Sequence, residues 1–241
     1  MKLFTFSICL FMLYCSAGFE SRRLVYNTSE IAYYTLEKGD FPNPKLLIGS
    51  FKHPHSMDEK KIMDILGNLK VKKQNSFGEV SMYIFSLVEL KNISRDLSQV
   101  LANLKEKEGA VFISKFDDDK SVLSANKRTS GLVWIDANGL NIIFGEIKRG
   151  FARESAKNFF EWTNIQPISM NVVADENEIE EDSVFQFNSV RGFKNRKWLI
   201  FKLDNLDKFQ FRERGDGKKL SRDMETMRPP KSEASVKKPE P

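Results

Sequence analysis

The segment 131–150 constrains the fold of this chain more than any other part of its sequence. Two apolar runs, residues 132–135 and 140–144, flank the dipeptide Asn138-Gly139. Asn-Gly between apolar runs is the strongest short-range signal for a two-residue β-hairpin turn, because both turn residues must adopt positive φ. The sequence therefore predicts a β-hairpin over residues 131–148.

The expected register of this hairpin makes both of its faces apolar. With Asn138 and Gly139 in the turn, Ile135 pairs with Ile142 and Trp134 pairs with Ile143. Alternation then gives two apolar sets, Val133, Ile135, Leu140, Ile142 and Phe144 on one face and Leu132, Trp134, Ile143 and Ile147 on the other. A ribbon that is apolar on both faces needs a covering layer on each side, so we expect it at the centre of the domain.

The rest of the chain predicts further strands and about three amphipathic helices. Strands are expected at 31–36, 45–51, 79–90, 110–116, 168–174, 183–190 and 197–203. Helices are expected after a capping box at Ser56, after an N-cap at Ser94 and over 153–162. The alternation of strands and helices between 45 and 116 fits parallel crossovers. We predict one α+β domain, residues 24–211, with a mixed, largely antiparallel sheet around the hairpin.

The first eighteen residues have the three parts of a secretory signal peptide. Lys2 supplies the basic start, residues 3–14 form a short apolar run, and Ser16, Ala17 and Gly18 are small residues suited to cleavage. The apolar run is shorter than the ~20 residues that a membrane-spanning helix needs. The sequence predicts a signal peptide at 1–18, a secreted, extracellular protein and no membrane anchor.

Cysteine usage limits the chemistry of the mature chain. The two cysteines, Cys9 and Cys15, both lie inside the predicted signal peptide, so the mature chain is expected to be free of disulfides. Cysteine nucleophiles and thiolate metal sites are excluded on the same ground. The core must then stabilise the fold by itself, and roughly 190 residues suffice because a chain of that size buries about 70% of its unfolded surface.

The net charge of +5 lies mostly outside the predicted domain. Lys2 belongs to the signal peptide, and the segment 212–241 carries nine basic and six acidic residues. The remaining domain is nearly neutral, and a nucleic-acid partner is not expected because it would need a concentrated basic face. Beyond Phe211 the chain lacks aromatic residues and is rich in Lys, Pro and Ser, which predicts a disordered basic tail over 212–241.

Three short motifs are typical of an exported protein. Asn27 and Asn92 each begin an Asn-x-Ser/Thr sequon, which predicts N-glycosylation at both sites. The tripeptide Arg214, Gly215, Asp216 is the one that RGD-binding integrins recognise through the arginine and the metal-coordinating aspartate. It gives an alternative function, a cell-adhesion ligand whose partner is an integrin-type receptor.

The sharpest catalytic pattern is Asp136 followed by Glu146 and Lys148. Metal-dependent nucleases of the PD-(D/E)xK class carry an acidic residue on one hairpin strand and (D/E)-x-K on the next, where two carboxylates hold Mg²⁺. In the expected register Asp136 and Glu146 are offset by about five residues, ~16 Å, and lie on opposite faces. Turn stabilisation by Asp136 and surface charge at Glu146 and Lys148 explain the pattern better. A secreted metal-dependent hydrolase with these three residues is the second alternative.

Other metal or catalytic sites have weaker support. His53 and His55 are the only histidines, so a zinc site would have to take Asp58 or Glu59 as further ligands, and loop residues around Pro54 are the favoured interpretation. The acidic clusters at 117–119 and 175–182 lack the spacing of a defined calcium loop. We predict no metal and no other cofactor.

These patterns together predict a secreted, N-glycosylated, non-enzymatic binding or interaction protein. Its partner is expected to be a protein or small-molecule ligand that the sequence does not identify.

Overall fold

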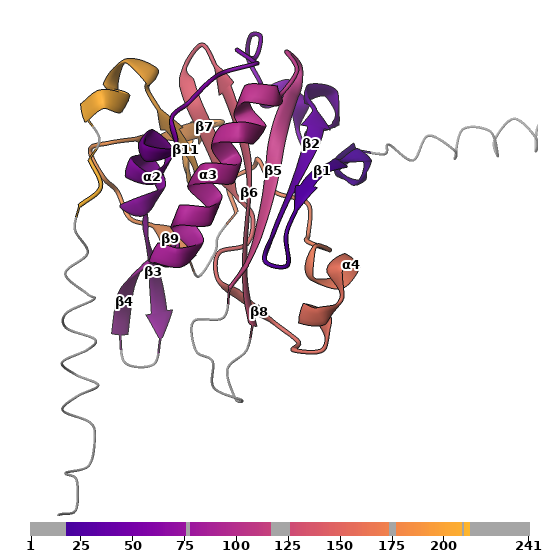
Figure 1. Cartoon of the computed structure of the whole chain (residues 1–241). Coiled ribbons are helices and arrows are strands. Elements are labelled where there is room, and N and C mark those ends of the chain that lie inside the picture. Colours follow the sequence, from indigo (N-terminus) through magenta and orange to yellow (C-terminus); the bar gives the residue numbers. More distant parts are fainter. Residues whose placement is uncertain (1–17, 76–77, 117–125, 174–176, 209, 213–241) are drawn as a thin grey trace, which may run out of the picture. The chain divides into compact units, whose positions relative to one another are not determined.

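The segment around Asn138 forms a β-hairpin, β6 (Asn126–Asp136) and β7 (Gly139–Phe144), in the computed structural model of the chain (Figure 1). The structure describes residues 18–75, 78–116, 126–173, 177–208 and 210–212. Several expected features lie outside these residues: the signal peptide as far as residue 17, the acidic cluster 117–119, the RGD tripeptide and the tail from residue 213. Residue 211 is the last residue of the compact unit.

The hairpin lies in the middle of an eight-stranded sheet with the order β1-β2-β5-β6-β7-β11-β10, and β8 pairs with the first residues of β6. The other strands of this sheet are β1 (Arg23–Asn27), β2 (Ile31–Glu37), β5 (Glu108–Phe116), β8 (Arg149–Phe151), β10 (Gln186–Val190) and β11 (Phe193–Phe201). Every pairing in the described part of the sheet is antiparallel. The domain is therefore α+β with an antiparallel sheet.

A second, three-stranded sheet and two helices complete one side of the domain. Its order is β4-β3-β9, formed by β3 (Lys70–Asn75), β4 (Gly78–Tyr83) and β9 (Asn177–Ile179). Helix α2 (Glu59–Gly67) begins after Asp58, whose carboxylate accepts a hydrogen bond from the Lys60 amide. Helix α3 (Leu87–Asn103) begins with a capping box in which Ser86 and Glu89 each bond the other's backbone amide.

The large sheet has a separate hydrophobic cluster on each face. On one face α2 and α3 pack on residues of the central strands, including Phe112, Val133, Ile135, Ile142 and Phe144. Figure 1 shows α3 lying along this face beside α2. On the other face the loops around Phe41 and Phe51 and the segment from Trp162 to Met170 cover Val111, Leu132, Trp134, Ile143 and Trp198. Both faces of the hairpin are buried, as the sequence predicted.

The hairpin register differs from the predicted one by two residues. Ile135 pairs with Leu140, and the turn residues are Ala137 and Asn138. Gly139 is the first residue of β7, with φ +136, and a Cβ atom there would collide with the carbonyl oxygen of Phe201. The close approach of β11 therefore fixes Gly139 in the strand and shifts the turn. A shift of two residues preserves alternation, so the predicted faces are correct for all residues up to Phe144.

Ile147 is the exception to the predicted faces. It packs with the cluster under α2 and α3 and not with Leu132, Trp134 and Ile143. Strand β7 ends at Phe144, and Lys148 has a positive φ of 47°. Alternation does not extend through this irregular connection, so the face of Ile147 was not predictable from it.

The predicted strand over 79–90 is correct only as far as Tyr83, and the predicted helix start at Ser94 is wrong. The segment contains β4 and the first turn of α3, whose N-cap, Ser86, lies eight residues before Ser94. The apolar residues Leu87 and Val88, taken as strand residues, are exposed on the helix surface, whereas Leu90 is buried. The capping box at Ser86 is the stronger local signal, and it begins the helix there.

Other predicted elements are absent or shorter. Residues 45–51 and 168–173 are not strands, although they supply buried residues to the second face of the sheet. The predicted helix over 153–162 is reduced to a 3₁₀ turn, η4 (Ser155–Lys157), and a single turn, α4 (Phe159–Trp162). The predicted crossovers are also wrong, because α3 connects β4 of the small sheet with β5 of the large sheet. Further 3₁₀ turns are η1 (Gly18–Ser21), η2 (Lys38–Asp40), η3 (Pro44–Leu46) and η5 (Leu203–Lys208).

Candidate functional site

The structure gives Asp136 a role in the hairpin turn. Its carboxylate accepts a hydrogen bond from the Asn138 amide at 2.7 Å and another from the indole nitrogen of Trp134 at 3.1 Å. Its side chain is buried. Both interactions are local and hold the end of β6 in place, as expected for a turn-stabilising residue.

Glu146 is buried in an ion pair at the other end of the hairpin. Both of its carboxylate oxygens accept from the guanidinium of Arg128, which also donates to the carbonyl oxygens of Trp162 and Asn164. The expectation that Glu146 is a surface charge is therefore wrong. The Glu146 amide donates to Ser130 on β6.

The three residues of the hydrolase pattern do not form one site. Ser130, which lies beside Glu146, is six residues along β6 from Asp136, roughly 20 Å at 3.3 Å per residue. The Lys148 amide donates to Thr129, so Lys148 also lies at the Glu146 end. The guanidinium of Arg128 already bonds both oxygens of the Glu146 carboxylate, which would have to bind the metal. The geometry offers no shared metal position between Asp136 and Glu146.

The histidines do not form a metal site either. His53 is buried, and its Nε2 accepts a hydrogen bond from the Ile135 amide at 3.1 Å. Burial lowers the pKa of His53 to about 4 and also lowers the pKa of His55. Among the described residues, no group of three His, Cys, Asp or Glu side chains is arranged to hold a metal ion. In the second acidic cluster, Glu178 and Glu181 pair with Arg196.

The two sequons lie in different environments. Asn27 is the exposed last residue of β1. Asn92 is partly exposed on α3, and the hydroxyl-bearing residue of its sequon, Ser94, is completely buried.

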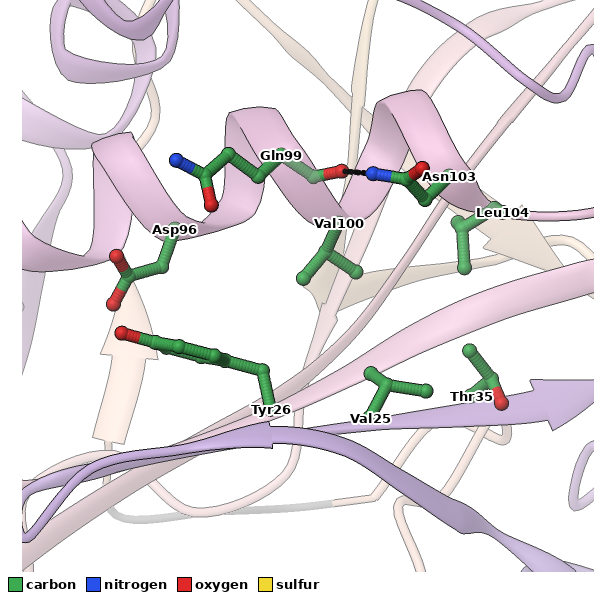
Figure 2. A pocket seen from close by; sticks show the side chains of 8 residues that line it. All are labelled: Val25, Tyr26, Thr35, Asp96, Gln99, Val100, Asn103 and Leu104. Atoms are coloured by element: carbon green, nitrogen blue, oxygen red, sulfur yellow. Dashed lines mark hydrogen bonds between the residues drawn. The ribbon is translucent and has the colours of Figure 1, made fainter.

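A pocket that the sequence analysis did not predict lies between the edge strand β1 and helix α3 (Figure 2). It is a cavity of about 280 Å³ lined by Val25, Tyr26, Thr35, Asp96, Gln99, Val100, Asn103 and Leu104. In Figure 2 the side chains of α3 form one wall, and those of β1 and β2 form the other. Most of the exposed lining is apolar.

Local features of β1 and α3 explain why a pocket forms there. The pairing of β1 with β2 has an irregularity between Leu24 and Tyr26. Val25 and Tyr26 therefore both contribute to the pocket, although consecutive strand residues normally point to opposite faces. On α3, Leu97 and Leu101 are buried in the core, and Asp96 and Val100, four residues apart, are also buried and line the pocket on the flank beside β1.

Asp96 is the unusual residue of this pocket. Its side chain is 3% exposed, and Oδ1 accepts from Nε of Arg95 at 2.9 Å. Oδ2 is buried and has no hydrogen-bond partner. A buried polar atom without a partner costs about 1–3 kcal/mol, so native proteins rarely leave one without a bound water, ion or ligand. The free acceptor on Asp96 marks this pocket as a candidate binding site.

The neighbouring Tyr33 does not satisfy Asp96. Its hydroxyl group donates to the carbonyl oxygen of Ile93 at 3.2 Å. Burial, and then the charge of Asp96, raise the pKa of Tyr33 well above its usual value, so Tyr33 stays neutral. The ring of Tyr26, 6.2 Å from that of Tyr33, lies at the pocket end that contains Asp96 (Figure 2).

One sequence signal, which the sequence analysis did not use, could have identified Asp96. Asp96 follows Ile93 by three residues and precedes Val100 by four, so on a helix it adjoins the apolar stripe. A carboxylate beside an apolar stripe is a candidate for burial. The partner strand β1 is short and exposed on both faces, and its sequence gave no comparable signal.

A larger pocket of about 460 Å³ lies at the turn of the central hairpin. Its charged side chains, Lys52, Lys202 and Asp204, are exposed, and its lining is mainly polar. Among its described lining residues none leaves a buried polar side-chain atom without a partner. It is a solvated groove with less reason to bind a specific ligand than the β1–α3 pocket.

Comparison of the chain with models of known protein families, with curated proteins and with solved structures gives no match. Within the described ranges of the chain, the helices are too short or too polar to span a membrane.

Proposed function

We propose that this chain is a secreted, N-glycosylated, non-enzymatic binding protein that takes a small amphipathic ligand in the β1–α3 pocket. The observation that supports this most directly is the mainly apolar cavity of about 280 Å³ with a buried, unpartnered carboxylate oxygen at one end. An apolar cavity with a few polar groups is the usual form of a small-molecule site.

The dimensions of the pocket favour a short, elongated ligand. Its volume lies just below the range of about 300–1,000 Å³ that is common for ligand sites. Asp96 and Leu104, the residue that follows α3, are eight residues apart, which corresponds to roughly 12 Å along the helix axis. Val25 and Val100 lie between these ends (Figure 2). A polar head at Asp96 with an apolar chain beside the two valines fits this arrangement.

The lining favours binding over catalysis. None of the eight residues that line the pocket is a histidine, cysteine, serine or lysine. The hydroxyl oxygen of Thr35 accepts from Arg23 at 3.5 Å, and no base beside it is arranged to activate it as a nucleophile. The pocket therefore supplies contacts and one carboxylate, without a nucleophile and base pair.

The proposal is tested with 1-hexanol as a neutral amphipathic probe. We expect saturable chemical-shift changes in the backbone amides of Val100 and Leu104 when the folded protein is titrated and followed by NMR. Val25→Trp places an indole in the pocket and is expected to abolish these changes. Leu24→Trp is the matched control, because Leu24 lies on the same strand with similar exposure but does not line the pocket.

Two outcomes would contradict the proposal. One is the absence of saturable changes at Val100 and Leu104. The other is equal loss of binding in Val25→Trp and Leu24→Trp, which would place the binding outside the pocket.

A further inference from the structure

We infer that the ligand of the β1–α3 pocket is an organic cation whose primary ammonium group binds Asp96. This inference rests on the proposed function and specifies the class of ligand. The first supporting observation is that Oδ2 of Asp96 accepts no hydrogen bond within the described part of the protein. This oxygen is buried beside the cavity.

The charge around Asp96 favours a positively charged donor. Asp96 carries the only charge among the eight residues that line the pocket. Arg95 contacts Oδ1 from outside, and its side chain is 50% exposed, so water screens its charge. Asp96 itself is almost completely buried, where an ion pair or charge-assisted hydrogen bond is stronger than at the surface. A carboxylate ligand would meet repulsion at the same position.

The groups around Asp96 match the donors of a primary ammonium. Such a group has three N–H donors and no acceptor. Figure 2 shows the side-chain amide of Gln99 and the hydroxyl of Tyr26 at the Asp96 end of the pocket. The amide oxygen, the phenolic oxygen and Oδ2 of Asp96 are three acceptors for these donors. The face of the Tyr26 ring adds a site for cation–π contact.

The missing donor also distinguishes primary amines from quaternary ammonium compounds. A trimethylammonium head carries positive charge but no N–H group, so it leaves Oδ2 of Asp96 unpaired. Its volume is also larger, in a cavity of only about 280 Å³. The pocket should therefore prefer n-hexylamine to hexyltrimethylammonium.

The experiment compares four probes of equal chain length on the folded protein at pH 7: n-hexylamine, hexyltrimethylammonium, 1-hexanol and hexanoate. Dissociation constants are measured by NMR titration. We expect n-hexylamine to bind at least tenfold more tightly than 1-hexanol and hexyltrimethylammonium, and hexanoate to bind most weakly. Asp96→Asn should remove the preference for the amine over the alcohol. Glu106→Gln, which removes an exposed carboxylate outside the pocket, should retain it.

The possible outcomes separate the two proposals. Equal binding of n-hexylamine and 1-hexanol to the unmodified protein would overturn the cation inference and leave the proposed binding function intact. Binding by none of the four probes would overturn both. If Asp96→Asn does not fold, as judged by circular dichroism, the comparison of n-hexylamine with hexyltrimethylammonium and 1-hexanol on the unmodified protein decides the inference.

Discussion

Replacing Glu146 by alanine should destabilise the domain strongly. The change would leave the guanidinium of Arg128, which is 10% exposed, without its carboxylate partner. Removing one member of a buried ion pair typically costs about 3–5 kcal/mol, because the remaining charge stays buried without compensation. For a domain of this size, each kcal/mol lowers Tm by about 2–4 °C, so the expected decrease is roughly 6–20 °C.

The free energy of unfolding is measured by urea denaturation followed by circular dichroism, and Tm by thermal denaturation. Glu181→Ala is the matched control, because Glu181 is 58% exposed and pairs with Lys194 at the surface. Breaking an exposed pair should cost about 0–1 kcal/mol. The double variant Arg128→Met with Glu146→Leu should regain much of the lost stability, because no charge is then left buried.

The reasoning would be refuted if Glu146→Ala cost no more than Glu181→Ala. The result also matters for the alternative function as a metal-dependent hydrolase. If Glu146→Ala destabilises the domain as expected, loss of activity in that variant would report unfolding and would not identify a metal ligand.

Two further predictions concern His53 and Gly139. Burial lowers the pKa of His53 from 6.5 to about 4, so the unfolded chain binds a proton more readily than the folded protein does. The free energy of unfolding should therefore be highest above about pH 6.5 and should fall by about 3 kcal/mol as the pH is lowered to 4. His53→Gln keeps an acceptor for the Ile135 amide but removes the titrating imidazole. Urea denaturation at several pH values should show that the free energy of unfolding of this variant decreases less at low pH. An unchanged pH profile would contradict the assignment of this pH dependence to His53. Gly139→Ala should cost more than about 2 kcal/mol, because the positive φ is strained for alanine and Cβ meets the Phe201 carbonyl. Gly192→Ala, also at positive φ but with open space around it, should cost about 1 kcal/mol, and equal losses in the two variants would disprove the role of the close approach.

The sequence alone determined the features that depend on neighbouring residues. The apolar runs around Asn138 predicted a hairpin buried on both faces, and the structure has it at the centre of the large sheet. The position of Asp136 two residues before Asn138 matches its turn contact. These features follow from alternation and short-range hydrogen bonds, which act over a few residues.

Only the tertiary structure decided the register of the hairpin, the burial of Glu146 and the pocket. The turn is shifted because Gly139 approaches Phe201, which is distant in sequence. Glu146 is buried because Arg128, eighteen residues earlier, bonds both of its oxygens. Asp96 lines a pocket because α3 packs beside the edge strand β1, about seventy residues away in the chain, and its Oδ2 has no hydrogen-bond partner there. Pairings between distant segments depend on the packing of the whole sheet, and the local sequence pattern is the same whichever partner is present.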